Sequence, residues 1–229
     1  MAKMTLNPGA LELSLVKIPA GFVPPMELLD PAQQSRARLF SGKRLTEFSA
    51  SRLLLAHSLG ADWCIQERDN TAPLAINKID KSQRLMSLSH SNGWVVVAIS
   101  PLESTCKFGV DIEKIRTNWS QRKARFFCNS QQIAAGIALK SEAEQDHFFT
   151  ALWTQKEAYF KATHNAFVEI DFKDDKRMNT SLLENNMVLS VYCEPITKIK
   201  IQRAEMVVNK NSVSFLPLEE LGFITAQSQ

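Results

Sequence analysis

Two carboxylates stand two residues apart in FGVDIEKI, residues 108–115. Because Phe, Val and Ile alternate with the other residues, the segment is predicted to be a strand with Asp111 and Glu113 on one face. A rise of about 3.3 Å per residue separates their backbones by roughly 7 Å, so both side chains could reach one hard divalent cation. Gly109 shares this face and would let a ligand approach the backbone. The alternative is a strand face with ordinary surface acids.

A second group of reactive side chains lies in LWTQKEAYFKA, residues 152–162. The pattern predicts a helix on which Trp153, Glu157 and Lys161, spaced four apart, share one face. Glu157 could complete a set of three carboxylates around magnesium, which typically keeps substrate phosphates among its ligands. Lys161 could then stabilise charge that develops on a leaving phosphate. The alternative is a Glu–Lys pair on a solvated helix face.

Groups that suit phosphate binding occur further upstream. In SLSHSNGW, His90 lies between two serines, and all three side chains can donate hydrogen bonds to a phosphate. A basic cluster also precedes and enters the first long predicted helix; its members are Arg36, Arg38, Lys43, Arg44 and Arg52. The alternatives are a histidine in a polar turn and a solvated basic face.

The elements that must position these groups are helices and strands in a mixed α/β (α+β) arrangement. A strand is predicted over ALELSLVKI and a helix up to Gly60, while QERDNTAPLAINKID is polar and turn-prone. Asn92-Gly93 predicts a tight hairpin before WVVVAI. A helix capped by Asn118 or Ser120 and another capped by Ser141 follow, and MVLSVYC, KIKIQRAEMVV and SVSFLP are predicted strands.

The composition limits the classes of protein to which this chain can belong. The 229 residues are 45% hydrophobic and 22% charged, which is ordinary for a globular protein, and a net charge of +3 is too small for a dedicated nucleic-acid binder. No apolar run is long enough to span a membrane, and the N-terminal residues do not resemble a signal peptide. Four dispersed cysteines predict free thiols, so we expect a cytoplasmic protein.

Three of these segments together resemble a known signature. SLSHS, FGVDIE and WTQKEAYFKA occur in the order found in the 4′-phosphopantetheinyl transferases. The length resembles the larger, surfactin-synthetase-activator-like branch, whose members are monomers with two similar α/β halves related by a pseudo-two-fold. The resemblance implies a half over residues 1–103 that binds the phosphates of coenzyme A. It also implies a half over residues 104–229 that carries the metal site and contacts the carrier protein.

The resemblance also implies a reaction. The 4′-phosphopantetheine group of coenzyme A would pass to a serine of an apo acyl or peptidyl carrier protein, with magnesium or manganese on the diphosphate. Asp111, Glu113 and Glu157 would hold the metal, while Glu157, or a water that it orients, would take the serine proton. Lys161 would neutralise or protonate the leaving phosphate. The groups implied to contact coenzyme A are Arg44 (its 3′-phosphate), Ser89, His90, Lys156 and Lys161.

Some features depart from the family pattern or leave alternatives open. TAPLAI lacks the lysine of the Gly-Lys-Pro sequence with which many relatives bind adenine. The segment QRKARFF lies where relatives approach the carrier, so its basic residues could steer docking, and Phe126 or Phe127 could pack against the carrier or in the core. Two other functions stay open: a non-catalytic module that binds coenzyme A or a carrier, and another magnesium-dependent, diphosphate-cleaving enzyme.

Overall fold

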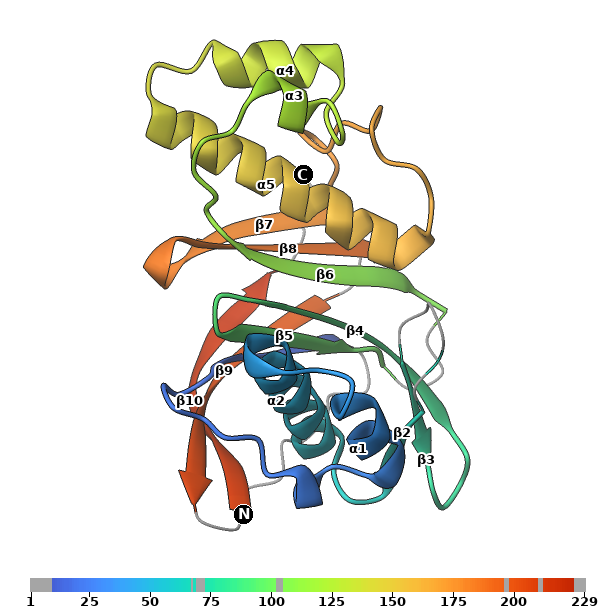
Figure 1. Ribbon diagram of the computed structural model, residues 1–229. Coiled ribbons are helices and arrows are strands. Elements are labelled where there is room, and N and C mark those ends of the chain that lie inside the picture. The colour runs from blue at the N-terminus through green and yellow to red at the C-terminus, as the bar shows by residue number, and fades with distance from the viewer. Residues whose placement is uncertain are drawn as a thin grey trace. The chain divides into compact units, whose positions relative to one another are not determined.

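The computed structural model describes residues 10–66, 68, 73–101, 105–195, 198–209 and 212–224, with the backbone alone over 219–224. The chain forms two compact units: Met1–Thr105 with Thr197–Gln227, and Cys106–Ile196 with Ser228–Gln229. Each unit packs a long helix against a sheet (Figure 1), which confirms the predicted mixed α/β class.

The first unit contains a seven-stranded sheet in the order β10-β9-β1-β5-β4-β3-β2. Its strands are β1 (Ala10–Lys17), β2 (Trp63–Gln66), β3 (Leu74–Asn77), β4 (Gln83–Ser91), β5 (Trp94–Ile99), β9 (Lys198–Asn209) and β10 (Ser212–Ile224). Neighbouring strands are antiparallel except β1 and β9, which are parallel. A parallel pair needs a long crossover, and here the chain of the second unit supplies it.

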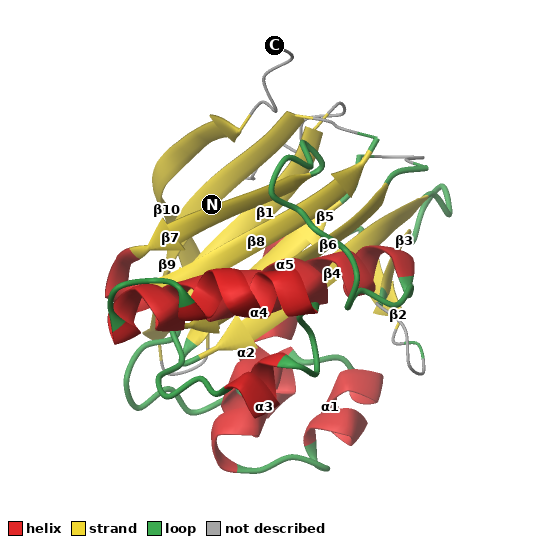
Figure 2. Ribbon diagram, turned by 90° about the horizontal axis from the view of Figure 1, so that it is seen from above, coloured by secondary structure: helices red, strands yellow, loops and turns green. Residues whose placement is uncertain are grey.

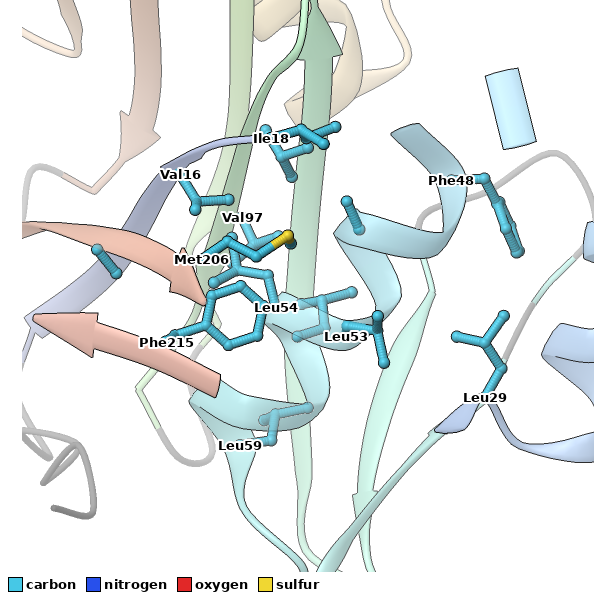
Figure 3. Packing of buried hydrophobic residues seen from close by; sticks show 14 of the residues in the cluster. Val16, Ile18, Leu29, Phe48, Leu53, Leu54, Leu59, Val97, Met206 and Phe215 are labelled. Atoms are coloured by element: carbon cyan, nitrogen blue, oxygen red, sulfur yellow. The ribbon is translucent and has the colours of Figure 1, made fainter. Parts of the chain in front are cut away.

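Helices η1 (Met26–Leu28), α1 (Pro31–Ala37) and α2 (Gly42–Leu59) belong to the first unit. Helix α2 ends at Gly60, whose φ of +86° favours glycine, as the sequence predicted. Its apolar side forms the core of the unit with residues from both ends of the chain. In Figure 3, Met206 of β9 and Phe215 of β10 point toward Leu54 of α2.

The hairpin predicted at Asn92-Gly93 joins β4 to β5. Both turn residues have positive φ, 50° and 79°, as a two-residue turn of this kind requires, and His90 faces Val95 in the register. The turn-prone segment between residues 66 and 80 also contains a strand that was not predicted, because Leu74–Asn77 forms β3, whose Ala75 is fully buried in the core. Thr71 and Ala72 of the TAPLAI segment lie outside the described residues.

The second unit contains a three-stranded antiparallel sheet in the order β6-β8-β7. Its elements are β6 (Lys107–Lys114), α3 (Gln121–Ala124), α4 (Ser130–Ile137), α5 (Glu142–Thr163), β7 (Met178–Leu183), η2 (Glu184–Asn186) and β8 (Met187–Glu194). Helix α5 packs along β6 and β8 (Figure 2). Ser120 and Ser141 accept hydrogen bonds from backbone amides at the starts of α3 and α5, so the cap predicted at Ser141 is confirmed, and Ser120 rather than Asn118 caps α3.

The last two strands correct the expected division of the chain. We expected residues 104–229 to form one half, but β1 pairs along its whole length with residues 198–205 of β9, and β10 pairs with β9. Ala204, Met206 and Phe215 are buried in the core of the first unit, and this burial draws the C-terminal segment back to it.

No helix in the described part of the chain is both long and apolar enough to cross a membrane. The first nine residues, on which part of the expectation about a signal peptide rests, lie outside the described residues.

Candidate active site

Strand β6 and helix α5 approach each other unusually closely at Gly109. A Cβ atom on this residue would lie 2.1 Å from the carbonyl oxygen of Ala158 and 2.9 Å from the amide nitrogen of Ala162. Only glycine fits against this backbone. The expectation that a ligand uses the space beside Gly109 is therefore wrong, because α5 fills it. The close approach also places Lys161 against β6.

Lys161 forms an ion pair with Asp111 across this contact. Its Nζ lies 2.7 Å from Asp111 Oδ1 and donates a second hydrogen bond, of 3.1 Å, to the carbonyl oxygen of Val110. Asp111 is only 4% exposed, and its Oδ2 is also buried. A buried carboxylate is costly without a charged partner, so the ion pair with Lys161 offsets part of the cost of burying Asp111.

A second ion pair lies where β6 ends. The Arg116 guanidinium donates to Glu113 Oε1 and lies 5.5 Å from the centre of the Trp153 ring. The backbone amide of Arg116 donates to Thr150 Oγ1, 3.0 Å away on α5. Arg116 was missed from the sequence, although its position three residues after Glu113 could have indicated it.

Glu157 experiences the charges of both ion pairs. Burial is the largest cause that raises the pKa of its carboxyl, and the negative charges of Asp111 and Glu113 raise it further. Lys161 and Arg116 oppose this shift by lowering the pKa. The three carboxylates that the sequence singled out therefore interact with one another and with two cationic side chains.

The donor set of these residues suits a hard cation. Among the described residues, no three His, Cys, Asp or Glu side chains are gathered closely enough to hold a metal ion as they stand. Their oxygens are nevertheless the ligands that magnesium and manganese prefer. A divalent cation would also offset the repulsion from Asp111 and Glu113 that raises the pKa of Glu157. The three carboxylates are therefore chemically suited to bind such a cation.

The segment that supplies these groups matches a family model. Residues 107–205 match the 4′-phosphopantetheinyl transferase superfamily, a span that includes Asp111, Glu113, Glu157 and Lys161. Residues 107–205 therefore belong to the 4′-phosphopantetheinyl transferase superfamily. No curated protein matches it.

Lys156, also in the superfamily segment, has surroundings unlike those of its neighbour Glu157. Its side chain is fully buried, and Nζ donates to Gln132 Oε1 at 3.0 Å and to the carbonyl oxygens of Phe167 and Val168 at 2.9 and 2.8 Å. These acceptors use all three ammonium hydrogens. The expected contact between Lys156 and coenzyme A stays a prediction, and it would have to displace at least one of these acceptors. Lys156 ties α5 to α4 and to the segment that follows α5.

Of the predicted phosphate-binding residues of the first unit, Ser89 and His90 do not share one surface. Ser89 is buried and His90 is partly exposed, and as consecutive strand residues they point to opposite faces of the sheet. Arg44 is exposed on α2, where its guanidinium stacks 4.4 Å from the centre of the Phe40 ring.

Sequence reasoning also missed Glu47, a buried acid on α2. Its Oε2 lies 3.1 Å from Nδ1 of His90, and its Oε1 accepts a hydrogen bond of 3.4 Å from the amide of Gly93. The sequence signal that could have indicated its burial is its position directly before the core residue Phe48.

The two phenylalanines after α3 have different environments. Phe127 is buried and packs against the rings of Trp119 and Trp153, with centre-to-centre distances of 5.2 and 5.3 Å. Phe126 is 75% exposed. Phe127 is therefore the core residue of the two. Phe126 forms an exposed patch, the α3 patch, together with Arg122, Lys123 and Arg125.

Proposed function

We propose that this protein transfers the 4′-phosphopantetheine group of coenzyme A to a serine of an apo acyl or peptidyl carrier protein. The Asp111–Lys161 ion pair beside Glu157, within the matched segment, is the observation that carries the proposal. Phosphoryl transfer depends on positioning and on charge stabilisation, and clustered acids with a lysine are suited to both.

The reaction exchanges one phosphorus–oxygen bond for another. The serine hydroxyl oxygen attacks the β-phosphorus of coenzyme A, and the bond from that phosphorus to the bridging oxygen breaks. Adenosine 3′,5′-bisphosphate leaves with the electron pair of that bond. Glu157, directly or through a water that it orients, accepts the serine proton. Lys161 stabilises the negative charge on the leaving phosphate, or donates a proton to it.

Asp111, Glu113 and Glu157 would hold a magnesium ion. When bound, magnesium neutralises the charge of the diphosphate and orients it. In the protein alone, Lys161 forms an ion pair with Asp111 and Arg116 forms one with Glu113, so both cations oppose the negative charge of these acids.

The remaining contacts are assigned by unit. In the first unit, Arg44 would bind the 3′-phosphate of coenzyme A, and Ser89 and His90 would bind its other phosphates. In the second unit, the positively charged α3 patch would receive an acidic carrier protein, with Phe126 packing against an apolar part of it. The protein would act as a cytoplasmic monomer of the surfactin-synthetase-activator-like branch, and its free cysteines suit a reducing compartment.

The proposal is tested by weighing an apo carrier protein by intact-mass spectrometry after incubation with the protein, coenzyme A and magnesium. The expected result is a gain of one phosphopantetheine group. Asp111→Asn, Glu157→Gln and Lys161→Met should each lower the rate by about 10²–10³-fold. Asp174→Asn neutralises an exposed acid of the same unit and should leave the rate unchanged.

Other outcomes separate the alternatives. Tight binding of coenzyme A without a mass gain on fatty-acid, polyketide or peptide carriers would indicate a non-catalytic module. Cleavage of coenzyme A without any carrier would indicate another diphosphate-cleaving enzyme. A mass gain that persists after chelation of divalent ions would contradict the metal role of the three carboxylates.

A further inference from the structure

A carboxylate is buried in the first unit, and the chemistry assigned to the second unit does not use it. The Glu47 side chain is only 8% exposed and lies on α2 between residues of the apolar core. Burying a carboxylate is costly unless donors compensate its charge. Its partners therefore indicate what the side chain does.

Two of the partners of Glu47 come from the β4–β5 hairpin. Oε2 lies 3.1 Å from His90 Nδ1, and Oε1 accepts the 3.4 Å hydrogen bond from the Gly93 amide. Lys43 Nζ lies 3.6 Å from Oε1, but the Lys43 side chain is 67% exposed, so this pair contributes little. His90 is therefore the principal charged partner of Glu47.

The hairpin turn holds both donors in one arrangement. Asn92 and Gly93 have positive φ, so the two-residue turn fixes how His90 lies relative to the Gly93 amide. One rigid carboxylate thus contacts both donors, and the His90 ring is held against α2.

This contact has a consequence for the imidazole. A carboxylate only accepts hydrogen bonds, so the nitrogen that faces it, Nδ1, must carry a proton. The second nitrogen, Nε2, lies on the edge of the ring away from Glu47, and the His90 side chain is 35% exposed. A carboxylate on one nitrogen fixes the tautomer and orientation of the ring and stabilises its positively charged form.

We propose that Glu47 is a positioning residue that holds His90 Nδ1–H against its carboxylate, so that the imidazolium form of the ring donates its Nε2–H to a phosphate of coenzyme A. The inference rests on the proposed function, since coenzyme A is the ligand. It adds Glu47 of α2 as the residue that orients His90 of β4 for its contact with a phosphate.

Two measurements on the ligand-free, full-length protein and its coenzyme A complex test the proposal. Long-range ¹H–¹⁵N NMR should show His90 as the Nδ1-protonated form, and Glu47→Ala should abolish this preference. Calorimetry should show coenzyme A binding weakened by about tenfold or more in Glu47→Ala, as for other residues that orient a binding histidine. The kcat at saturating coenzyme A should stay near the wild-type value.

Two further variants keep the test sharp. Glu47→Gln retains an acceptor oxygen and should keep the tautomer, but without the charge it should still weaken coenzyme A binding. Ser58→Ala removes another buried hydrogen bond between α2 and the sheet, that with Ser14 at 3.1 Å, and so controls for general loosening. It should lower stability without moving the His90 signals or the dissociation constant.

A ligand-free wild type in which the neutral His90 ring carries its proton on Nε2 alone would overturn the proposal. Unchanged NMR signals and coenzyme A affinity in Glu47→Ala would also overturn it, and if that variant does not fold, unchanged affinity in Glu47→Gln would do so. Failure of the proposed function is distinguishable, because it appears as no mass gain on any carrier while the His90 tautomer still reports on Glu47.

Discussion

At the scale of single residues, the lack of a side chain at Gly109 allows the candidate active site to form. Gly109 lets the backbone of α5 approach β6, and this approach brings Lys161 Nζ to 2.7 Å from Asp111. The glycine thus acts on the chemistry through packing rather than through contact with a ligand.

Gly109→Ala should therefore disturb both stability and activity. The added Cβ would meet the Ala158 carbonyl oxygen at 2.1 Å, and a backbone atom cannot move aside without displacing the helix. We expect a loss of about 1–3 kcal/mol in the free energy of unfolding, measured with urea. We also expect a fall in kcat, because Lys161 moves away from Asp111.

Gly136→Ala is the matched control for this prediction. Its Cβ would also be crowded, at 2.4 Å from Phe149, but by ring atoms of a side chain that can turn. Alanine also favours the helix by about 1 kcal/mol relative to glycine. This variant should keep its kcat, and an equal loss of kcat in both variants would contradict the role given to Gly109.

The lowered pKa of His57 predicts how the free energy of unfolding depends on pH. Burial lowers the pKa of this histidine, whose ring lies 5.0 Å from that of Phe215. The unfolded chain then binds a proton more readily than the folded protein does. The contribution of His57 is complete above a pH of about 6.5 and is lost as the pH falls below it, by at most about 1.4 kcal/mol per pH unit.

Urea unfolding at several pH values between neutral and acidic checks this prediction. The slope of the free energy of unfolding against pH should be smaller in His57→Gln than in the wild type. Identical slopes in the two proteins would show that His57 does not contribute.

At the scale of elements, α5 combines three roles on different faces. Glu157 and Lys161 interact with Asp111 of β6, while Phe149 and Leu152 pack in the core of the second unit. Lys156 is bound on its own face by α4 and the segment after α5. The reactive groups are therefore carried on a helix that is anchored along its length.

The α3 patch belongs to the same scale, since its charge and exposed ring lie on one short element. Arg125→Glu and Phe126→Ala should each raise the KM for an acidic carrier protein by about tenfold, with no change in the KM for coenzyme A. The wild-type KM for the carrier should also rise with salt. Initial rates at varied carrier concentrations provide the measurement.

Lys140→Glu makes the same change of charge at an exposed position after α4 and serves as the control. If it raises the KM for the carrier as much as Arg125→Glu does, net charge rather than the α3 patch governs docking.

At the scale of the whole molecule, the first unit is completed by the end of the chain. The second unit is inserted between β5 and β9, and β9 then pairs with β1. The first unit therefore cannot complete its core until Met206 and Phe215 have been made.

Phe215→Ala should destabilise the protein by about 3–5 kcal/mol, because it leaves a cavity against α2. Leu218→Ala, in the same strand but 54% exposed, should cost far less. Urea unfolding of both variants measures the difference, and equal costs would contradict the place of β10 in the core.

Much of the candidate site could be predicted from the sequence. The spacing of Asp111 and Glu113 indicated a strand, and the four-residue spacing of Glu157 and Lys161 indicated a helix face. These patterns are local, and the structure and the family match bear out the elements and the superfamily. The hairpin at Asn92-Gly93 was predictable for the same reason, because its turn chemistry lies within two residues.

Only the tertiary structure decided which residues meet across long separations in sequence. It buried Lys156 among Gln132 and two carbonyl oxygens, although helical spacing alone could not show which face of α5 would be covered. It also joined Glu47 to His90 and returned β9 to β1. Such contacts depend on how whole elements pack, because burial and pairing energies are gained only when distant segments come together.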